Sequence, residues 1–433
     1  MEKYNHINEF YVQKGEEFLV KDVLPDFYIG KNLGSVNADF ALKFLQNELN
    51  AALSSFINGG FSYKGFVLYP FVRDVSKGNL RKIKRLKDVI LFLDKKGYDF
   101  SESIKKYNKN ANSDNFASVL SSLYQDFSKI KFKNLASITK PECREFEIKD
   151  YKKSDLSYLS PLNELKRYAN NKLRKYLSGF YLHGSLATGD YVKGWSDVDT
   201  LAVISRETVK NPDKLHELRD RMYRMRHYFY KIDPLQHHGS IIISEYDLEN
   251  YCQAYFPVPI FKYAKSLLKG DKVKKFSARD FSSEALTKLF YFVNYFRRLN
   301  IERKFSMGSY DTKALLHSIT LFPSVYLQAK GVLGYKKFSF DMAKKDFSKK
   351  TWEVINRVSL IRSSWKSIGS LPLISLSSSV NPLPAYQFNS RIMDLFSDVK
   401  KANNIDVRYL VGNMHKLSEE AWSRTKKNAK KRL

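Results

Sequence analysis

The chain has 433 residues, and its 74 lysines and arginines exceed its 45 aspartates and glutamates by 29 charges. That length predicts roughly two to four domains. An excess of this size favours a polyanionic partner such as nucleic acid, because clustered cations release counterions from phosphates. The alternative is a basic composition without a binding role, since the lysines and arginines are also spread along the chain. The only cysteines, Cys143 and Cys252, exclude a disulfide framework and a cysteine-based zinc site.

Neither a secretory signal nor a membrane span is expected. The first ten residues, MEKYNHINEF, contain no apolar segment of the kind that a signal peptide needs. No apolar run approaches the roughly 20 residues that cross a bilayer. We therefore expect a soluble, cytoplasmic protein without a membrane partner; the sequence leaves its oligomeric state open.

In chain order, the first expected domain covers residues 1–150 and has no assigned role. It is mostly helical, because residues 38–57 carry apolar side chains at helical spacing, whereas residues 63–72 favour a strand. A polar segment without clear periodicity at residues 146–162 predicts a boundary. We place a second domain at residues 151–250 and a helical third domain with a basic tail at residues 251–433.

Within the second domain, helices are expected at residues 163–177 and 207–230. They flank the apolar stretch FYLHGSLATGDYVKGWSDVDTLAVI, residues 180–204. A further strand is expected at residues 236–244. The third domain is expected to contain helices at residues 282–300 and 310–332, a Ser- and Pro-rich loop at residues 369–386, and a mobile tail from residue 423.

Two basic clusters suit phosphate contacts. One is the run from Arg81 to Lys87, and the other comprises Arg219, Arg221, Arg224 and Arg226 on a predicted helix. Either cluster could hold an RNA backbone, with tyrosine and phenylalanine available to stack on bases. The alternative is a solvated helix face, which is the more common reason for such a run.

The stretch from Phe180 to Ile204 contains most of the candidate site residues. Gly184 and Ser185 form a turn between a strand and a short helix, and Asp197 and Asp199 follow on the returning strand. Side chains two residues apart on a strand point to the same face, so the two carboxylates converge. They repel each other unless a cation neutralises them. Helix N–H groups and the Ser185 hydroxyl suit phosphate oxygens, and the carboxylates suit Mg²⁺.

Gly-Ser followed after eleven residues by Asp-x-Asp resembles the signature of the nucleotidyltransferase superfamily typified by DNA polymerase beta. Within it, the chain is most similar to the branch of minimal and aminoglycoside nucleotidyltransferases, over roughly residues 165–345. The resemblance implies an α+β fold, in which a mixed sheet is flanked by helices. It also implies that Asp197 and Asp199 bind Mg²⁺, and that a nucleotide passes from a nucleoside triphosphate to an acceptor with release of pyrophosphate.

The sequence departs from the family at the third carboxylate, which usually lies on a neighbouring strand. Here that segment carries His237 and His238, and either imidazole could ligate a metal or accept a proton. We take His238 as the catalytic candidate. Asp233 and Glu245 are the carboxylate alternatives. The remaining interpretation is that the two adjacent histidines have only a structural role.

A second area of resemblance, residues 310–340, corresponds to a helix that passes close to the triphosphate in this branch. The resemblance implies Lys313 as a phosphate contact, with Lys336 and Lys337 behind it. The alternative is that these lysines are solvated and have no binding role, as is common in a chain this basic.

The leading interpretation is a magnesium-dependent nucleotidyltransferase that uses a nucleoside triphosphate, with ATP as the expected nucleotide. The charge favours RNA as the acceptor over a small molecule or a protein. The competing interpretation is a nucleic-acid-binding protein that has kept the fold without catalysis, which the missing third carboxylate supports.

Overall fold

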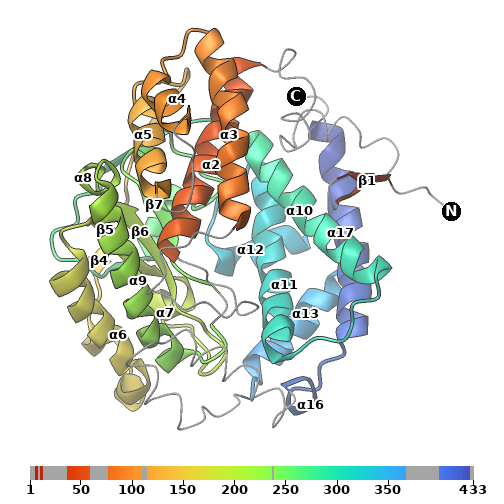
Figure 1. Ribbon diagram of the computed structural model, residues 1–433. Coiled ribbons are helices and arrows are strands. Elements are labelled where there is room, and N and C mark those ends of the chain that lie inside the picture. The colour runs from red at the N-terminus through yellow and green to blue at the C-terminus, as the bar shows by residue number, and fades with distance from the viewer. Residues whose placement is uncertain are drawn as a thin grey trace.

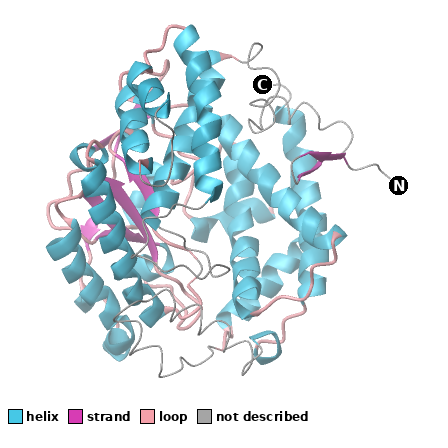
Figure 2. Ribbon diagram, viewed as in Figure 1, coloured by secondary structure: helices cyan, strands magenta, loops and turns pink. Residues whose placement is uncertain are grey.

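The structure is a computed structural model (Figure 1), and it describes residues 5–7, 10–12, 37–58, 77–108, 115–236, 238–366 and 399–429. The expected strand at residues 63–72, the loop at residues 369–386 and His237 lie outside the described residues, as do the side chains of Arg81 to Arg85. The fold is α+β, with helical segments before and after a mixed five-stranded sheet (Figure 2).

Before residue 146, most residues in regular elements are helical. The elements are β1 (Asn5–Ile7), β2 (Phe10–Val12), α2 (Ala38–Asn58), α3 (Lys77–Lys95), α4 (Ser101–Asn108), α5 (Phe116–Phe127), β3 (Ala136–Thr139) and β4 (Arg144–Glu145). Leucine, alanine and phenylalanine recur along α2 at three- and four-residue spacing, which buries one face of this helix as its periodicity predicts.

The sheet and its connections follow. The polar segment at residues 146–162 forms two short 3-10 turns before the helix begins. The elements are α6 (Leu156–Tyr168), β5 (Leu177–His183), α7 (Gly184–Thr188), β6 (Asp199–Ile204), α8 (Arg206–Val209), α9 (Pro212–Ile232), β7 (Ile241–Ser244), β8 (Lys265–Ser266) and β9 (Lys275–Ala278). Asn211 accepts a hydrogen bond from the Lys214 amide and caps α9, and Pro212 opens it, so the expected helix at residues 207–230 is divided in two.

The sheet has the strand order β4-β8-β5-β6-β7. β6 runs antiparallel to β5 and parallel to β7. Alternate residues of β6 enter different cores: Ala202 and Ile204 face the helices, whereas Leu201 and Val203 join the aromatic side chains of residues 251–276. Both faces are therefore covered, which explains why this strand is a continuous apolar run.

The helical part that follows comprises α10 (Ser282–Ile301), α11 (Ser309–Ala329), α12 (Lys336–Lys344), α13 (Lys349–Ser363), α16 (Val399–Ala402) and α17 (Val407–Ala429). These helices share a separate hydrophobic core. In Figure 1 they form the half of the molecule away from the sheet. The tail expected to be mobile is helical up to Ala429. Among the described residues, no helix combines the length and the apolar character needed to cross a bilayer.

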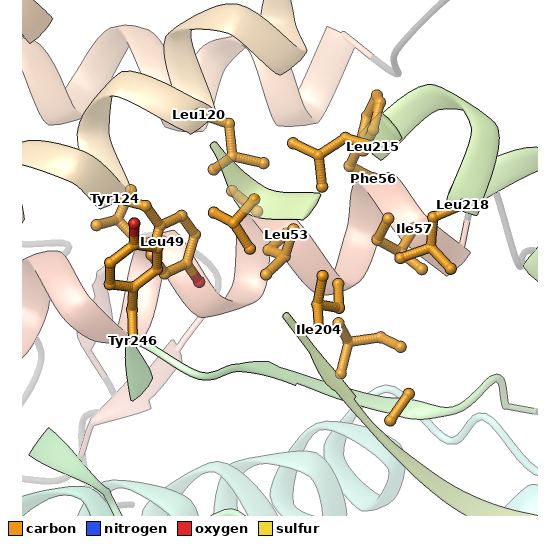
Figure 3. Packing of buried hydrophobic residues seen from close by; sticks show 14 of the residues in the cluster. Leu49, Leu53, Phe56, Ile57, Leu120, Tyr124, Ile204, Leu215, Leu218 and Tyr246 are labelled. Carbon is orange, nitrogen blue, oxygen red and sulfur yellow. The ribbon is translucent and has the colours of Figure 1, made fainter. Parts of the chain in front are cut away.

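The N-terminal helices and the sheet share one core (Figure 3). Leu49, Leu53, Phe56 and Ile57 of α2 belong to the same buried cluster as Ile204 of β6. That cluster also contains residues of α5, α6 and α9. The hydrophobic core therefore runs across the sequence boundary at residue 150, and the division into 1–150, 151–250 and 251–433 stays a prediction.

Candidate active site

The two aspartates and His238 lie together at one end of the sheet. His238 Nε2 is 2.8 Å from Asp197 Oδ2 and 3.2 Å from Asp199 Oδ1. One potential ligand atom from each of the three residues can be chosen so that all lie within 4.8 Å of one another. The sequence-predicted pair and its predicted imidazole partner are therefore brought to one point.

The Gln236 side chain holds this arrangement. β6 begins at Asp199, so Asp197 precedes the strand. Val198 N donates to Gln236 Oε1 at 2.9 Å, and Gln236 Nε2 donates to Val198 O at 3.2 Å and to His238 O at 3.0 Å. The amide thus pairs with the Val198 backbone as a neighbouring strand would, and it fixes the aspartates relative to His238. Sequence reasoning missed this role.

Electrostatics explain how two carboxylates are tolerated here. Burial opposes a charge on His238, yet the Asp197 and Asp199 carboxylates raise the pKa of His238 well above its usual value. Asp197 is 6 % exposed, so its charge is partly desolvated. In its protonated form, the His238 imidazole lies between the two anions and offsets their repulsion. A divalent cation placed at the same point would do so with twice the charge.

The turn at Gly184 and Ser185 approaches the carboxylates closely. Gly184 has φ +71°, and a Cβ atom there would lie 2.1 Å from Asp199 Oδ2. Only glycine accepts both this backbone conformation and this approach. Ser185 Oγ donates to Ser196 Oγ at 2.9 Å, and Val192 N donates to Ser196 Oγ at 3.0 Å. Ser185 is thus anchored beside the aspartates, at the start of α7.

The other carboxylate alternatives occupy different sites. Asp233 is fully buried, and its Oδ1 lies 2.6 Å from Lys313 Nζ. Burial raises the pKa of Asp233 to about 6, against the opposing effect of Lys313. Glu245 accepts a hydrogen bond from the Arg206 backbone N–H at 2.8 Å. Of these alternatives, His238 occupies the position beside the two aspartates.

Lys313 does not line the cavity next to the aspartates. Its side chain is 0 % exposed and faces Asp233. In this geometry the ammonium group of Lys313 faces its carboxylate partner and not the cavity, so a direct contact with a substrate phosphate stays a prediction. Lys336 and Lys337, the residues predicted behind it, do line the cavity.

That cavity has a volume of about 670 Å³ and lies between the sheet and the helical part of the chain. Besides Gly184, Ser185 and the cluster of Asp197, Asp199 and His238, its lining includes residues of α11, α12 and α13 and the segment 255–260. Figure 1 shows α11 beside the sheet half of the molecule. The size suits a nucleotide-sized ligand.

Several cationic groups line the cavity. Lys336 Nζ donates to Thr320 Oγ1 at 3.0 Å, and burial lowers the pKa of Lys336 although the two aspartates oppose this. Arg362 Nη2 donates to Asp190 O at 3.0 Å. Lys337 lies 3.8 Å from Asp190 Oδ2. Arg362 was not anticipated, because only the tertiary fold brings α13 to this cavity.

His317 is another site residue that sequence reasoning missed. Its Nδ1 lies 3.7 Å from Asp197 Oδ2, and its ring stacks on Trp195 with centroids 4.8 Å apart. His317 follows Lys313 by one helical turn. Because this helix was expected to pass the triphosphate, the i, i+4 spacing from Lys313 could have indicated that His317 lies near the site.

Half of the arginine cluster on α9 is buried. Arg219 is 4 % and Arg226 is 2 % exposed, and their guanidinium groups lie over the rings of Phe56 and Tyr223 at 4.9 and 5.3 Å. These two arginines cannot contact an RNA backbone at the surface, which corrects that part of the expectation. Arg224 is exposed and Arg221 is half-buried.

Residues 162–236 match the family model described as Nucleotidyltransferase domain. The matched segment contains Gly184, Ser185, Asp197 and Asp199, and it ends two residues before His238. This part of the chain is therefore a nucleotidyltransferase domain. No curated protein and no solved structure gave a match.

Proposed function

We propose that this protein transfers a nucleotide from a nucleoside triphosphate to an acceptor hydroxyl, with Asp197 and Asp199 holding the divalent cation. The observation that carries the proposal is the convergence of these carboxylates beside the Gly184–Ser185 turn. Their oxygens are the hard donors that divalent cations accept beside phosphates. We place the domain nearest to the minimal and aminoglycoside branch, on its Gly-Ser and Asp-x-Asp spacing.

In this reaction the acceptor oxygen forms a bond to the α-phosphorus while the bond from that phosphorus to the bridging oxygen breaks, and pyrophosphate leaves. The acceptor proton passes to a base or to water. A bound divalent cation would activate the attacking oxygen and stabilise the leaving one. Gly184 and Ser185 would approach the phosphates, while Lys336, Lys337 and Arg362 would offset the charge of the leaving pyrophosphate.

RNA is the acceptor that we favour, and ATP is the nucleotide. The support for RNA is the excess of 29 positive charges, to which the exposed Arg224 and the basic tail contribute. The burial of Arg219 and Arg226 removes two of the groups first considered for it. A small molecule or a protein as acceptor is distinguished by the product of the test reaction.

The test incubates the purified chain with Mg²⁺ or Mn²⁺, each α-labelled nucleoside triphosphate and total RNA or cell extract. We expect label to appear on RNA, and to be lost with Asp197→Ala/Asp199→Ala. The double variant Asp213→Ala/Asp220→Ala is the control, because it removes two exposed carboxylates of α9 that do not line the cavity. Label on a small molecule or on protein would replace RNA as the acceptor. No transfer to anything would contradict the proposal.

A further inference from the structure

His238 contributes a nitrogen donor where the family pattern expects a carboxylate. Its Nε2 faces Asp197 and Asp199 at 2.8 and 3.2 Å. The potential ligand atoms are therefore two carboxylate oxygens and one imidazole nitrogen, within 4.8 Å of one another. This spacing is typical of atoms that share one metal ion.

The other ring nitrogen is positioned to orient the imidazole. His238 Nδ1 lies 3.0 Å from Gly239 O. A carbonyl oxygen can only accept a hydrogen bond, so this contact places a proton on Nδ1. In the neutral ring, the lone pair then lies on Nε2, toward the aspartates. A backbone carbonyl that fixes the tautomer in this way is the usual companion of a metal-bound histidine.

This donor set discriminates between metals. Mg²⁺ binds oxygen almost exclusively, whereas imidazole suits first-row transition metals, which also accept carboxylates. Compared with a site of three carboxylates, a site with two carboxylates and one imidazole should therefore bind Mn²⁺ or Co²⁺ with similar affinity. It offers Mg²⁺ a poor third ligand.

We propose that Asp197, Asp199 and His238 form a site that prefers a first-row transition-metal dication, such as Mn²⁺, to Mg²⁺, with His238 Nε2 acting as a ligand. The location of the site rests on the proposed function, but metal binding is measurable without any transfer reaction. Mg²⁺ bound to the incoming triphosphate is compatible with this site, because its ligands are phosphate oxygens and water.

The test uses the full chain, freed of metal by dialysis against a chelator. Mn²⁺ and Mg²⁺ are titrated separately, with calorimetry and the loss of the free Mn²⁺ electron paramagnetic resonance signal as readouts. We expect Mn²⁺ to bind at least about tenfold more tightly than Mg²⁺. In His238→Asp the preference should shrink by about tenfold or more, since an oxygen donor replaces the nitrogen.

Two further measurements separate ligation from a structural effect. Pulsed electron paramagnetic resonance of bound Mn²⁺ should show coupling to an imidazole nitrogen in the wild type and in the control His227→Ala, whose ring lies on α9 away from the cavity. The coupling should vanish in His238→Asp, with melting curves establishing that the variant is folded.

Equal affinities of the wild type for the two metals, or nitrogen coupling that survives in folded His238→Asp, would overturn the inference. Its failure is distinguishable from failure of the proposed function. Nucleotide transfer without any preference for Mn²⁺ would contradict only the metal inference. A preference for Mn²⁺ without transfer to any acceptor would contradict only the proposed function.

Discussion

At the scale of single residues, Gly184 is the position where backbone and chemistry constrain each other most. Its φ of +71° and the 2.1 Å approach of a Cβ atom to Asp199 Oδ2 both exclude a side chain. In Gly184→Ala, Asp199 must shift away from Asp197 and His238. We expect nucleotide transfer to fall by about 100-fold, because displacement of a catalytic group by about 1 Å has an effect of this size.

Gly189 provides a matched control for this prediction. Its φ is +77°, but a Cβ atom there would meet nothing within 4 Å. Both alanine variants should lose about 1–2 kcal/mol of stability from the left-handed backbone. Only Gly184→Ala should lose transfer activity when the rates are measured below both melting temperatures. Equal losses of activity in the two variants would mean that backbone strain, and not the carboxylate contact, determines the effect.

Lys288 lines the same cavity and gives a pH-dependent prediction. Its Nζ donates to Ala254 O at 3.0 Å and to Gln328 Oε1 at 3.1 Å, and burial lowers the pKa of Lys288 to about 8. In the unfolded chain this pKa is about 10.4. Between these values the unfolded state binds more protons, so the contribution of Lys288 to the free energy of unfolding rises with pH.

The free energy of unfolding of the wild type minus that of Lys288→Met should therefore be larger at pH 9.5 than at pH 7.5. Urea denaturation at the two pH values measures it. A difference that is constant, or that shrinks at the higher pH, would show that the ammonium group is not penalised by its burial.

The residue scale also shows what the sequence could predict of the site. Asp197, Asp199, Gly184 and Ser185 are close in sequence, so their convergence could be predicted. The strand geometry expected for the pair was wrong in one respect, because Asp197 precedes β6 and does not lie on it. The third partner depends on where β7 is placed relative to β6. Local spacing could not decide whether His238 or Asp233 is the third site residue. The answer depends on a neighbouring helix, whose Lys313 pairs with Asp233.

At the scale of elements, the Asp233–Lys313 pair joins the C-terminal end of α9 to α11. Both side chains are almost fully buried, and their charged atoms are 2.6 Å apart. Removing one member of such a pair leaves a charge buried without its partner, which typically costs about 3–5 kcal/mol. We expect Lys313→Met to lower the free energy of unfolding by about that amount, as measured by urea denaturation.

A double-mutant cycle tests whether the loss belongs to the pair. Adding Asp233→Asn to Lys313→Met removes the uncompensated charge, so the double variant should be more stable than Lys313→Met alone. If Lys313→Met instead weakens triphosphate binding and leaves stability unchanged, Lys313 contacts the substrate as the resemblance implied.

Helix α9 shows why burial was hard to predict from a run of arginines. Helical spacing places Arg219 and Arg226 seven residues apart, on the same face as Met222, and this face packs against α2 and its surroundings. Their stems join the core and their guanidinium groups lie over aromatic rings, as long amphipathic side chains allow. Periodicity indicated the helix, but only the packing partner decides which of its arginines remain at the surface.

At the scale of the whole molecule, the sequence predicted helical regions on both sides of a mixed sheet, and the structure has this arrangement. It could not predict that α2 belongs to the same core as the sheet, since the contacts join residues almost 200 positions apart. Asn50 Nδ2 donates to Ile242 O at 3.2 Å, and Asn58 Nδ2 donates to Ser240 O at 2.9 Å. The α2 amides thus satisfy one carbonyl group of β7, the edge strand, and one of the residue just before it.

This shared core predicts that the catalytic domain depends on α2 for its stability. Leu53 is 0 % exposed at the centre of the contact (Figure 3), so Leu53→Ala should cost about 2–5 kcal/mol. Leu360→Ala is the matched control: this leucine of α13 is 61 % exposed, and the same change should stay within about 0.5 kcal/mol.

Deletion of residues 1–133 extends the same argument, because it removes α2 to α5, whose side chains share a buried cluster with one face of the sheet. The remaining chain should show no cooperative thermal transition by circular dichroism and should bind a hydrophobic dye. A truncated chain that melts cooperatively and still transfers nucleotide would show that residues 1–133 form an independent unit. In that case the helices would have to serve the acceptor or another partner, because the fold would not need them.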